Sequence, residues 1–219
     1  MSAEPLRVVI VDDHGVVRRG VRALIETHPA WRVVGEGATG REAVELVRHL
    51  RPHVVVLDLS MPEMNGLEAT RQIVTESPQT EVLVLTMHHS EQLARDVLQA
   101  GARGYLLKSD ADQNLIAAVD SLRQHKPFLT STVTEFVLDG YMQSADGADD
   151  AETLPRVTPR EREVIQLIAE GHSSKATAAV LGVSVKTVDA HRANIMRKLR
   201  LRSVSDLVRY AIRNKMVQP

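Results

Sequence analysis

Apolar residues follow two patterns along the first 127 residues. Short apolar runs alternate with longer segments in which apolar residues recur every three or four positions. The runs are typical of strands buried on both faces of a parallel sheet, and the wider spacing is typical of helices. Strands are predicted at residues 6–11, 32–36, 54–57, 81–85 and 104–107, and helices at 16–27, 40–50, 66–76, 90–100 and 112–124. This alternation predicts an α/β domain: a doubly wound, five-stranded parallel sheet with helices on both faces.

The pattern changes after residue 127. Apolar residues at helical spacing predict a sixth helix at residues 130–142, and the small, acidic stretch 144–153 predicts a flexible linker. Four short basic helices follow, at residues 159–170, 173–181, 185–199 and 203–214. The chain is therefore expected to comprise a domain at 1–127, a connecting helix and linker at 128–154, and a small all-α four-helix domain at 155–219.

Charge is distributed unevenly along the chain. The net charge is −3 over residues 1–127, −6 over 128–155 and +8 over 156–219, although the whole chain carries only −1. A compact basic domain behind an acidic spacer indicates a polyanionic partner for that domain alone. The alternative at this point is a solvated basic surface without a partner.

Composition excludes several classes of protein. The chain has no cysteine, which excludes disulfides, a thiol nucleophile and a thiolate metal site. No apolar run is long enough to span a membrane, and the N-terminus lacks the pattern of an export signal. We therefore expect a cytoplasmic protein with no membrane partner.

Polar residues stand where four of the five predicted strands end. They are Asp12, Asp13, Asp58, Thr86 and Lys108. The carboxyl ends of parallel strands meet at one edge of the sheet, where α/β proteins bind ligands. Each residue alone could cap a helix or lie on the surface, but together they predict a site.

The chemistry of this set suits phosphoryl transfer. Three carboxylates need a cation, and Mg²⁺ prefers carboxylates, water and phosphate oxygens. Asp58 would be the nucleophile, while Mg²⁺, Lys108 and the Thr86 hydroxyl would stabilise charge on the phosphoryl oxygens. No glycine-rich phosphate loop is present, so ATP is not the evident donor. Three nearby histidines are expected around the site or on the surface, because Mg²⁺ prefers oxygen: His14, His88 and His89.

The basic domain contains a helix-turn-helix pattern. Residues 173–181 are followed by Gly182-Val183, and Ser184 can cap the next helix. On that helix Val188, Ile195 and Leu199 form an inward stripe. The outward residues, which would enter the major groove of DNA, are Lys186, Asp189, Ala190, Ala193 and Arg197. The alternative is a generic four-helix bundle with a basic surface.

The first-domain residues together resemble the receiver domain of two-component response regulators. The resemblance rests on Asp12-Asp13, on Asp58 with Met61-Pro62 and Gly66, on Thr86, and on the stretch 101–108, and it covers about residues 5–125. It implies a flavodoxin-like fold with Asp58 as phospho-acceptor. It also implies Mg²⁺ held by Asp58, Asp13 and the Ser60 carbonyl, with Asp12 acting through water. Tyr105 and Thr86 would be switch residues. Receivers often have proline after the lysine, and here the residue is Ser109.

The second domain resembles LuxR-type output domains, and the whole chain resembles the NarL/FixJ family. Residues 154–164 and 184–199 carry the likeness, which covers about 155–216. It implies a transcriptional regulator that a histidine kinase phosphorylates, and that then dimerises on paired DNA half-sites. The expected DNA-contacting residues are Lys175, Ser184, Lys186, Thr187, Asp189, Ala190, Arg192, Ala193, Arg197 and Lys198.

The chain departs from the family pattern at one position in the second domain. After Lys175 the family usually has Glu-Ile-Ala, whereas this chain has Ala-Thr177-Ala, which predicts packing weaker by about 1–3 kcal/mol.

Two other functions are weighed against this one. An Mg²⁺-dependent phosphatase would carry an acid at position 60, where this chain has Ser60. A ligand-sensing LuxR-type regulator would need an apolar pocket in place of the strand-end residues. We therefore expect no enzyme beyond self-phosphorylation and dephosphorylation.

Overall fold

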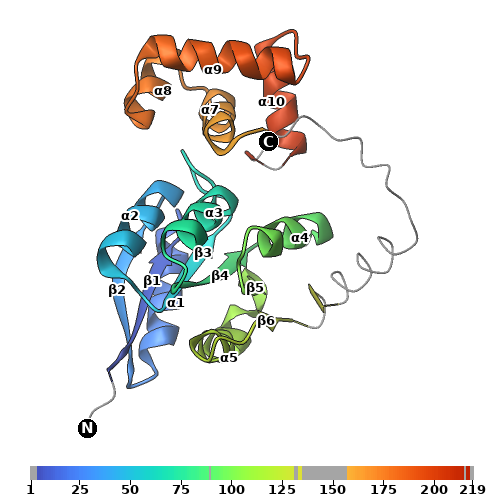
Figure 1. The fold of residues 1–219 in the computed structure, drawn as a ribbon. Helices are drawn as coiled ribbons and strands as arrows, with labels where there is room; N and C mark the ends of the chain where they lie inside the picture. Colours follow the sequence, from blue (N-terminus) through green and yellow to red (C-terminus); the bar gives the residue numbers. More distant parts are fainter. Residues whose placement is uncertain (1–3, 89, 131–132, 135–156, 215, 218–219) are drawn as a thin grey trace. The chain divides into compact units, whose positions relative to one another are not determined.

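The computed structural model describes residues 4–88, 90–130, 133–134, 157–214 and 216–217. The chain divides into two compact units (Figure 1). Most of the first unit extends to Ala148, and most of the second begins at Asp149. Each unit is described here by itself. No helix in the described ranges is long and apolar enough to cross a membrane.

The first unit is built on a parallel sheet in the order β2-β1-β3-β4-β5-β6 (Figure 1). The strands are β1 Leu6–Val11, β2 Trp31–Gly37, β3 Val54–Asp58, β4 Glu81–Thr86, β5 Gly104–Leu107 and β6 Phe128–Leu129. The strand order reverses at β1, which pairs with β2 on one side and β3 on the other. In sheets of this kind ligands bind outside the carboxyl ends of the strands at that point.

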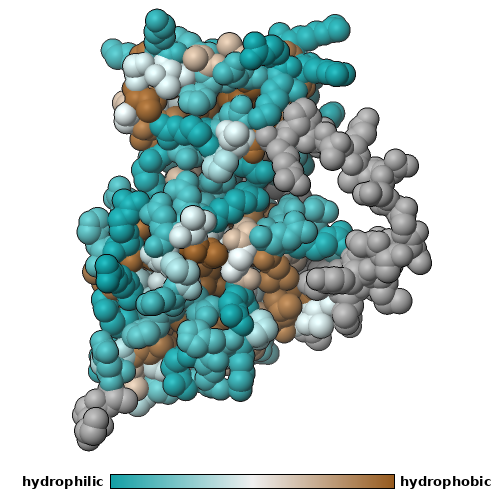
Figure 2. All heavy atoms as spheres, in the orientation of Figure 1, coloured by the Kyte–Doolittle hydropathy of each residue, from teal (hydrophilic) through white to brown (hydrophobic). Residues whose placement is uncertain are grey.

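Helices cover both faces of the sheet, as the alternating pattern predicts. They are α1 Gly15–Glu26, α2 Gly40–Leu50, α3 Gly66–Glu76, α4 Glu91–Gln99 and α5 Ala111–Arg123. α1 packs beside α5, while α3 lies between α2 and α4. Ile10, Val56 and Leu85 of the sheet share one buried cluster with Ile25 of α1 and Leu115 of α5. Hydrophilic residues cover most of the visible surface, and apolar ones show mainly in the gaps between them (Figure 2).

The sheet differs from the prediction by one strand. The prediction of five strands was wrong, because Phe128 and Leu129 pair in parallel with Gly104 and Tyr105 of β5. Two residues cannot show a period, so this strand had no recognisable pattern. The helix predicted at 130–142 and the linker at 144–153 lie almost entirely outside the described residues.

Helix starts in this unit follow local capping chemistry. The Thr39, Asn65 and Ser90 side chains accept hydrogen bonds from the backbone N–H three residues later, so α2, α3 and α4 begin where N-cap rules place them. Glu42 differs slightly from a capping box, because its carboxylate accepts from the Ala38 N–H instead of that of Thr39.

The second unit contains four described helices around a small core (Figure 1). They are α7 Pro159–Ala169, α8 Ser174–Leu181, α9 Val185–Lys198 and α10 Val204–Arg213. A capping box between Thr158 and Glu161 begins α7. Gly182 ends α8 in the left-handed conformation, with φ of 64°, which glycine adopts without strain. The four helices lie within one residue of their predicted bounds.

Candidate functional site

Two buried carboxylates share one buried ammonium group at the carboxyl edge of the sheet. Asp12 follows β1 and Asp58 ends β3, and their side chains are each 3 % exposed. Lys108 follows β5, and its Nζ lies 2.7 Å from Asp12 Oδ2 and 3.1 Å from Asp58 Oδ2. The three side chains thus meet at the carboxyl edge of the sheet, as predicted from their positions at strand ends.

The surroundings of Asp58 hold its pKa above the ordinary value. Burial raises the pKa of Asp58 from 3.8 to about 6, Lys108 acts against the rise, and the charge of Asp12 adds to it. Its Oδ1 also accepts a hydrogen bond of 2.8 Å from the Leu59 N–H, which favours the ionised form. The Asp58 carboxyl is therefore mostly ionised at neutral pH.

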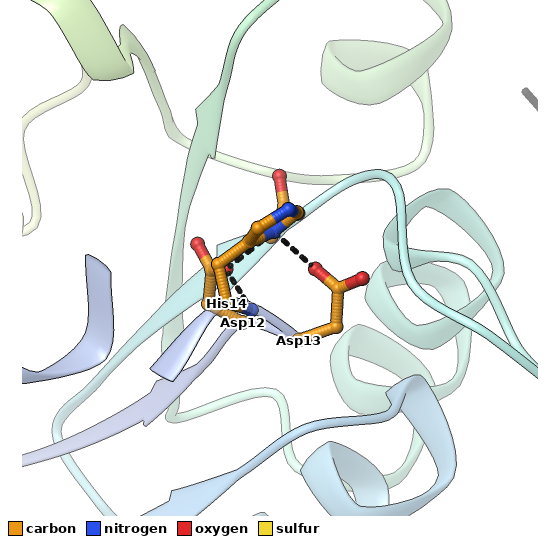
Figure 3. A group of neighbouring side chains, drawn as sticks. Asp12, Asp13 and His14 are labelled. Atoms are coloured by element: carbon orange, nitrogen blue, oxygen red, sulfur yellow. Dashed lines mark hydrogen bonds and ion pairs between the residues drawn. The ribbon is translucent and has the colours of Figure 1, made fainter. Parts of the chain in front are cut away.

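Asp13 and His14 form the exposed rim of the same cluster (Figure 3). The His14 ring turns toward both aspartates, with Nδ1 2.7 Å from Asp13 Oδ1 and 3.5 Å from Asp12 Oδ1. The backbone N–H of His14 also donates a hydrogen bond to Asp12 Oδ1 at 2.8 Å. The prediction that His14 lies around the site agrees with this geometry.

The donor set fits a hard divalent cation. One ligand atom from each of Asp12, Asp13, His14 and Asp58 lies within 4.8 Å of the others. Asp12 Oδ2 is buried and accepts no hydrogen bond among the described residues, so it faces Lys108 through charge alone. Carboxylate oxygens clustered in this way are the ligands of Mg²⁺ in proteins.

Thr86 and Tyr105 meet at one backbone segment beside the site. Thr86 is fully buried at the end of β4, and its hydroxyl oxygen accepts from the His88 N–H at 3.1 Å. Tyr105 is 1 % exposed, and its hydroxyl donates to the His88 carbonyl at 2.8 Å. Burial raises the pKa of Tyr105 to about 12. A change at Thr86 can therefore reach Tyr105 through the backbone of His88.

Ser60 makes a side-chain contact that its sequence position does not reveal. Its hydroxyl lies 3.0 Å from His88 Nε2, so the loops after β3 and β4 touch at the rim of the site. His89 lies outside the described residues. Ser60 and His88 are 28 positions apart in the sequence, which explains why a sequence pattern could not pair them.

Two backbone features support Asp58 and Lys108. A Cβ on Gly66 would lie 2.0 Å from the Asp58 carbonyl oxygen, so only glycine allows α3 to begin this close to the site. After Lys108 the chain forms a short 3₁₀ turn, Lys108–Asp110. No peptide bond in the described ranges is cis, so the bond between Lys108 and Ser109, where receivers often have proline, is trans.

The second unit presents α9 after a tight turn from α8. The Ser184 hydroxyl accepts from the Thr187 N–H and caps α9, so Ser184 and Thr187 are both committed to that cap. Val188 and Ile195 are buried, as predicted. The predicted outward residues of α9 are exposed, and so is Lys175 on α8: Lys186, Asp189, Ala190, Ala193 and Arg197.

Two basic residues of the predicted DNA-contacting set are held or partly covered within the domain. Lys198 Nζ lies 2.7 Å from Glu161 Oε2, in an ion pair within the domain. Arg192 is half-buried. The Lys198 ammonium would have to leave Glu161 to reach a phosphate. The exposed Arg197 guanidinium makes no ion pair in the described ranges and donates one hydrogen bond, to Asn194 Oδ1 at 2.8 Å.

Thr177 is buried in α8 with an unsatisfied hydroxyl. It is fully buried, and its Oγ1 makes no hydrogen bond in the described part of the chain. A buried hydroxyl without a partner costs free energy, which agrees with the weaker packing predicted from the sequence.

Replacing Thr177 with valine should therefore stabilise the second unit by about 1–2 kcal/mol, because valine keeps the shape and removes the unsatisfied hydroxyl. Thr177→Ile should act in the same direction, and Thr177→Ser, which keeps the hydroxyl and loses a methyl group, should destabilise. Calorimetric unfolding of the full chain measures the effect. Fluorescence of the single tryptophan, Trp31, identifies the transition of the first unit. A Thr177→Val transition at or below the wild-type temperature would contradict the expectation.

The two units match two protein families. Residues 8–120 match the response regulator receiver domain, and residues 156–211 match the bacterial regulatory proteins of the luxR family. The chain belongs to the response regulators. This response regulator thus carries its acidic cluster in the receiver domain and α9 in the LuxR-type output domain.

Relatives of this response regulator match it over nearly its whole length. The oxygen regulatory protein NreC of Staphylococcus epidermidis is 40 % identical in an alignment that covers 97 % of this chain and 100 % of that protein. The RcsB response regulator of Salmonella typhimurium is 29 % identical, with a TM-score of 0.59, over 95 % of this chain and 98 % of its own. A structure of the two-component response regulator RcsB–DNA complex gives a TM-score of 0.57 at 29 % identity, over 94 % and 97 % of the two chains. The function of this family is phosphorylation-dependent regulation of transcription, as the sequence predicts.

Proposed function

We propose that this response regulator accepts a phosphoryl group on Asp58 from a histidine kinase. The observation that carries the proposal is the buried Asp12–Lys108–Asp58 triad at the carboxyl edge of the receiver sheet. An Asp58 oxygen attacks phosphorus and forms an acyl phosphate, while the bond to the donor's leaving atom breaks and the leaving group keeps its electron pair. Bound Mg²⁺ would supply charge neutralisation for the phosphoryl oxygens.

The residues around Asp58 have distinct roles in this proposal. Asp58, Asp13 and the Ser60 carbonyl would hold Mg²⁺, and Asp12 would act through water. Lys108 neutralises charge on the phosphoryl group, and the Thr86 hydroxyl donates to one of its oxygens. That donation draws Thr86 away from its present contact with the His88 N–H and so disturbs the backbone that Tyr105 also binds.

The output of this change is proposed to be DNA binding by a phosphorylated homodimer. Support comes from α9 with its exposed basic residues and from the similarity to RcsB, which has been solved with DNA. Paired output domains would place their α9 helices in two half-sites of the major groove. We further infer domain bounds of 1–127, 128–154 and 155–219, action in the cytoplasm, and no turnover of a separate substrate.

The test uses the full chain, a small acyl phosphate and Mg²⁺. The wild type should gain the mass of one phosphoryl group, shift to a dimer on sizing and bind duplex DNA more tightly, whereas Asp58→Asn should do none of these. Asp112→Asn, an exposed change of the same chemistry on α5, should behave as the wild type. Equal mass gain by Asp58→Asn, or no DNA binding under any condition, would refute the proposal.

A further inference from the structure

A second basic feature of the output domain lies outside the predicted DNA-contacting set. A hollow of about 440 Å³ opens where the chain turns from α9 into α10. Four arginines, one acid and one aromatic residue line most of it: Arg200, Arg202, Arg209, Arg213, Asp206 and Tyr210. The hollow therefore gathers positive charge on a domain that is already basic.

The acid in the hollow pairs with one of these four arginines, Arg209. Asp206 accepts from the backbone and hydroxyl of Ser203, from the Arg202 N–H and from Arg209 at 2.8 Å. Hydrogen bonds from Ser203 and then Arg209 lower the pKa of Asp206 to about 2. The Asp206 carboxylate is thus occupied by the N-cap of α10 and by Arg209. Within the described ranges, Arg200 and Arg213 make no ion pair, and neither does the guanidinium of Arg202.

Arg200 occupies a backbone position that suits glycine. Its φ is 52°, and the chain around it closes α9 with hydrogen bonds from Arg200 N to Arg197 O and from Leu201 N to Met196 O. Helices commonly end in this left-handed conformation with glycine, because a Cβ is strained there. Glycine can therefore replace Arg200 and remove its side chain without adding backbone strain.

We propose that this arginine hollow binds the phosphodiester backbone of duplex DNA beside the groove that α9 enters. The inference rests on the proposed DNA binding and adds a phosphate contact to it. Arginine is suited to this role because its planar fork pairs with phosphate oxygens in two parallel hydrogen bonds. The hollow also continues the exposed basic end of α9, where Arg197 lies one turn before Arg200. Contacts of this kind raise affinity and fix orientation without reading sequence.

The salt dependence of binding tests the proposal. The full chain is treated with a small acyl phosphate and Mg²⁺, and its affinity for a mixed-sequence duplex is measured by fluorescence anisotropy at several salt concentrations. Arg202→Gln/Arg213→Gln should bind about tenfold more weakly, and the slope of log affinity against log salt should fall by about 2. Arg19→Gln/Arg51→Gln removes the same charge from exposed receiver positions, and should keep the wild-type affinity and slope.

A second variant separates binding from stability. Arg200→Gly relieves the left-handed strain, so its unfolding temperature should equal or exceed that of the wild type. Its DNA affinity should nevertheless fall by about threefold, since one phosphate contact is lost. Unchanged affinity in Arg200→Gly would overturn the proposal, because a merely structural arginine predicts no loss.

Two further outcomes are decisive. If the wild type binds DNA and the hollow variants match it in affinity and slope, the inference fails and the proposed function stands. If the phosphorylated wild type does not bind the duplex, the proposed function and this inference fall together. Poly-L-glutamate is the probe for an acidic protein partner. Loss of its binding in Arg202→Gln/Arg213→Gln, with DNA binding intact, would assign the hollow to such a partner and overturn the proposal.

Discussion

Replacing Lys108 with alanine is expected to slow phosphorylation by a small acyl phosphate by a factor of about 100 or more at pH 7. Two effects act in the same direction. The transition state loses a cation 3.1 Å from the Asp58 carboxylate, in a position to neutralise the incoming phosphoryl group. The pKa of Asp58 also rises further, because Lys108 opposes the effect of burial. Less of the carboxylate is then ionised and able to attack.

Intact mass measured over time gives the rate of phosphorylation for each variant. Lys108→Arg keeps the charge, so it should retain more activity than Lys108→Ala. The rate of Lys108→Ala should recover in part as the pH rises from 7 to 9, since that ionises Asp58. A Lys108→Ala rate close to that of the wild type would show that this lysine serves the fold alone.

Asp58→Asn should stabilise the metal-free receiver at neutral pH by up to about 3 kcal/mol. The folded-state pKa of Asp58 is about 6, above its ordinary value of 3.8. The folded domain therefore holds this proton more tightly than the unfolded chain does. The stability contributed by the group is fully present below about pH 4 and is lost as the pH rises through 6. Asparagine cannot ionise, so the variant does not lose this stability as the pH rises.

Denaturant unfolding followed by Trp31 fluorescence measures the effect, because this residue lies 2 % exposed in the receiver core. The difference between Asp58→Asn and the wild type should vanish near pH 4 and grow between pH 4 and 7. Added Mg²⁺ should narrow it at pH 7, since the ion binds the wild-type carboxylate more tightly and stabilises the folded state by mass action. A difference independent of pH would contradict the assigned origin of the effect.

Local chemistry made most of the fold predictable. α3 begins after Asn65, whose side chain caps it, and the predicted range 66–76 agrees with the structure. Asp12 and Asp58 could be placed together because parallel strands present their carboxyl ends at one edge of the sheet. The site was therefore predictable from strand ends, without any knowledge of side-chain geometry.

Other features depend on packing that no local pattern encodes. The Lys198–Glu161 ion pair joins residues 37 positions apart, and its formation depends on the crossing of α7 and α9. The contact between Ser60 and His88 depends on the shapes of two loops. The arginine hollow is lined by the turn after α9 and by α10, so the sequence shows the charges of these residues but not that they line one hollow.

The close approach of Gly66 to Asp58 matters for anyone redesigning this regulator to answer a different kinase. Position 66 is closed to every side chain, because even a methyl group would collide with the carbonyl of Asp58, the proposed phospho-acceptor. The rim residues His14, Ser60 and His88 carry no such restriction, since their side chains are exposed or only half-buried. Substitutions intended to alter the response are therefore best placed at the rim, where they leave the backbone beneath Asp58 in place.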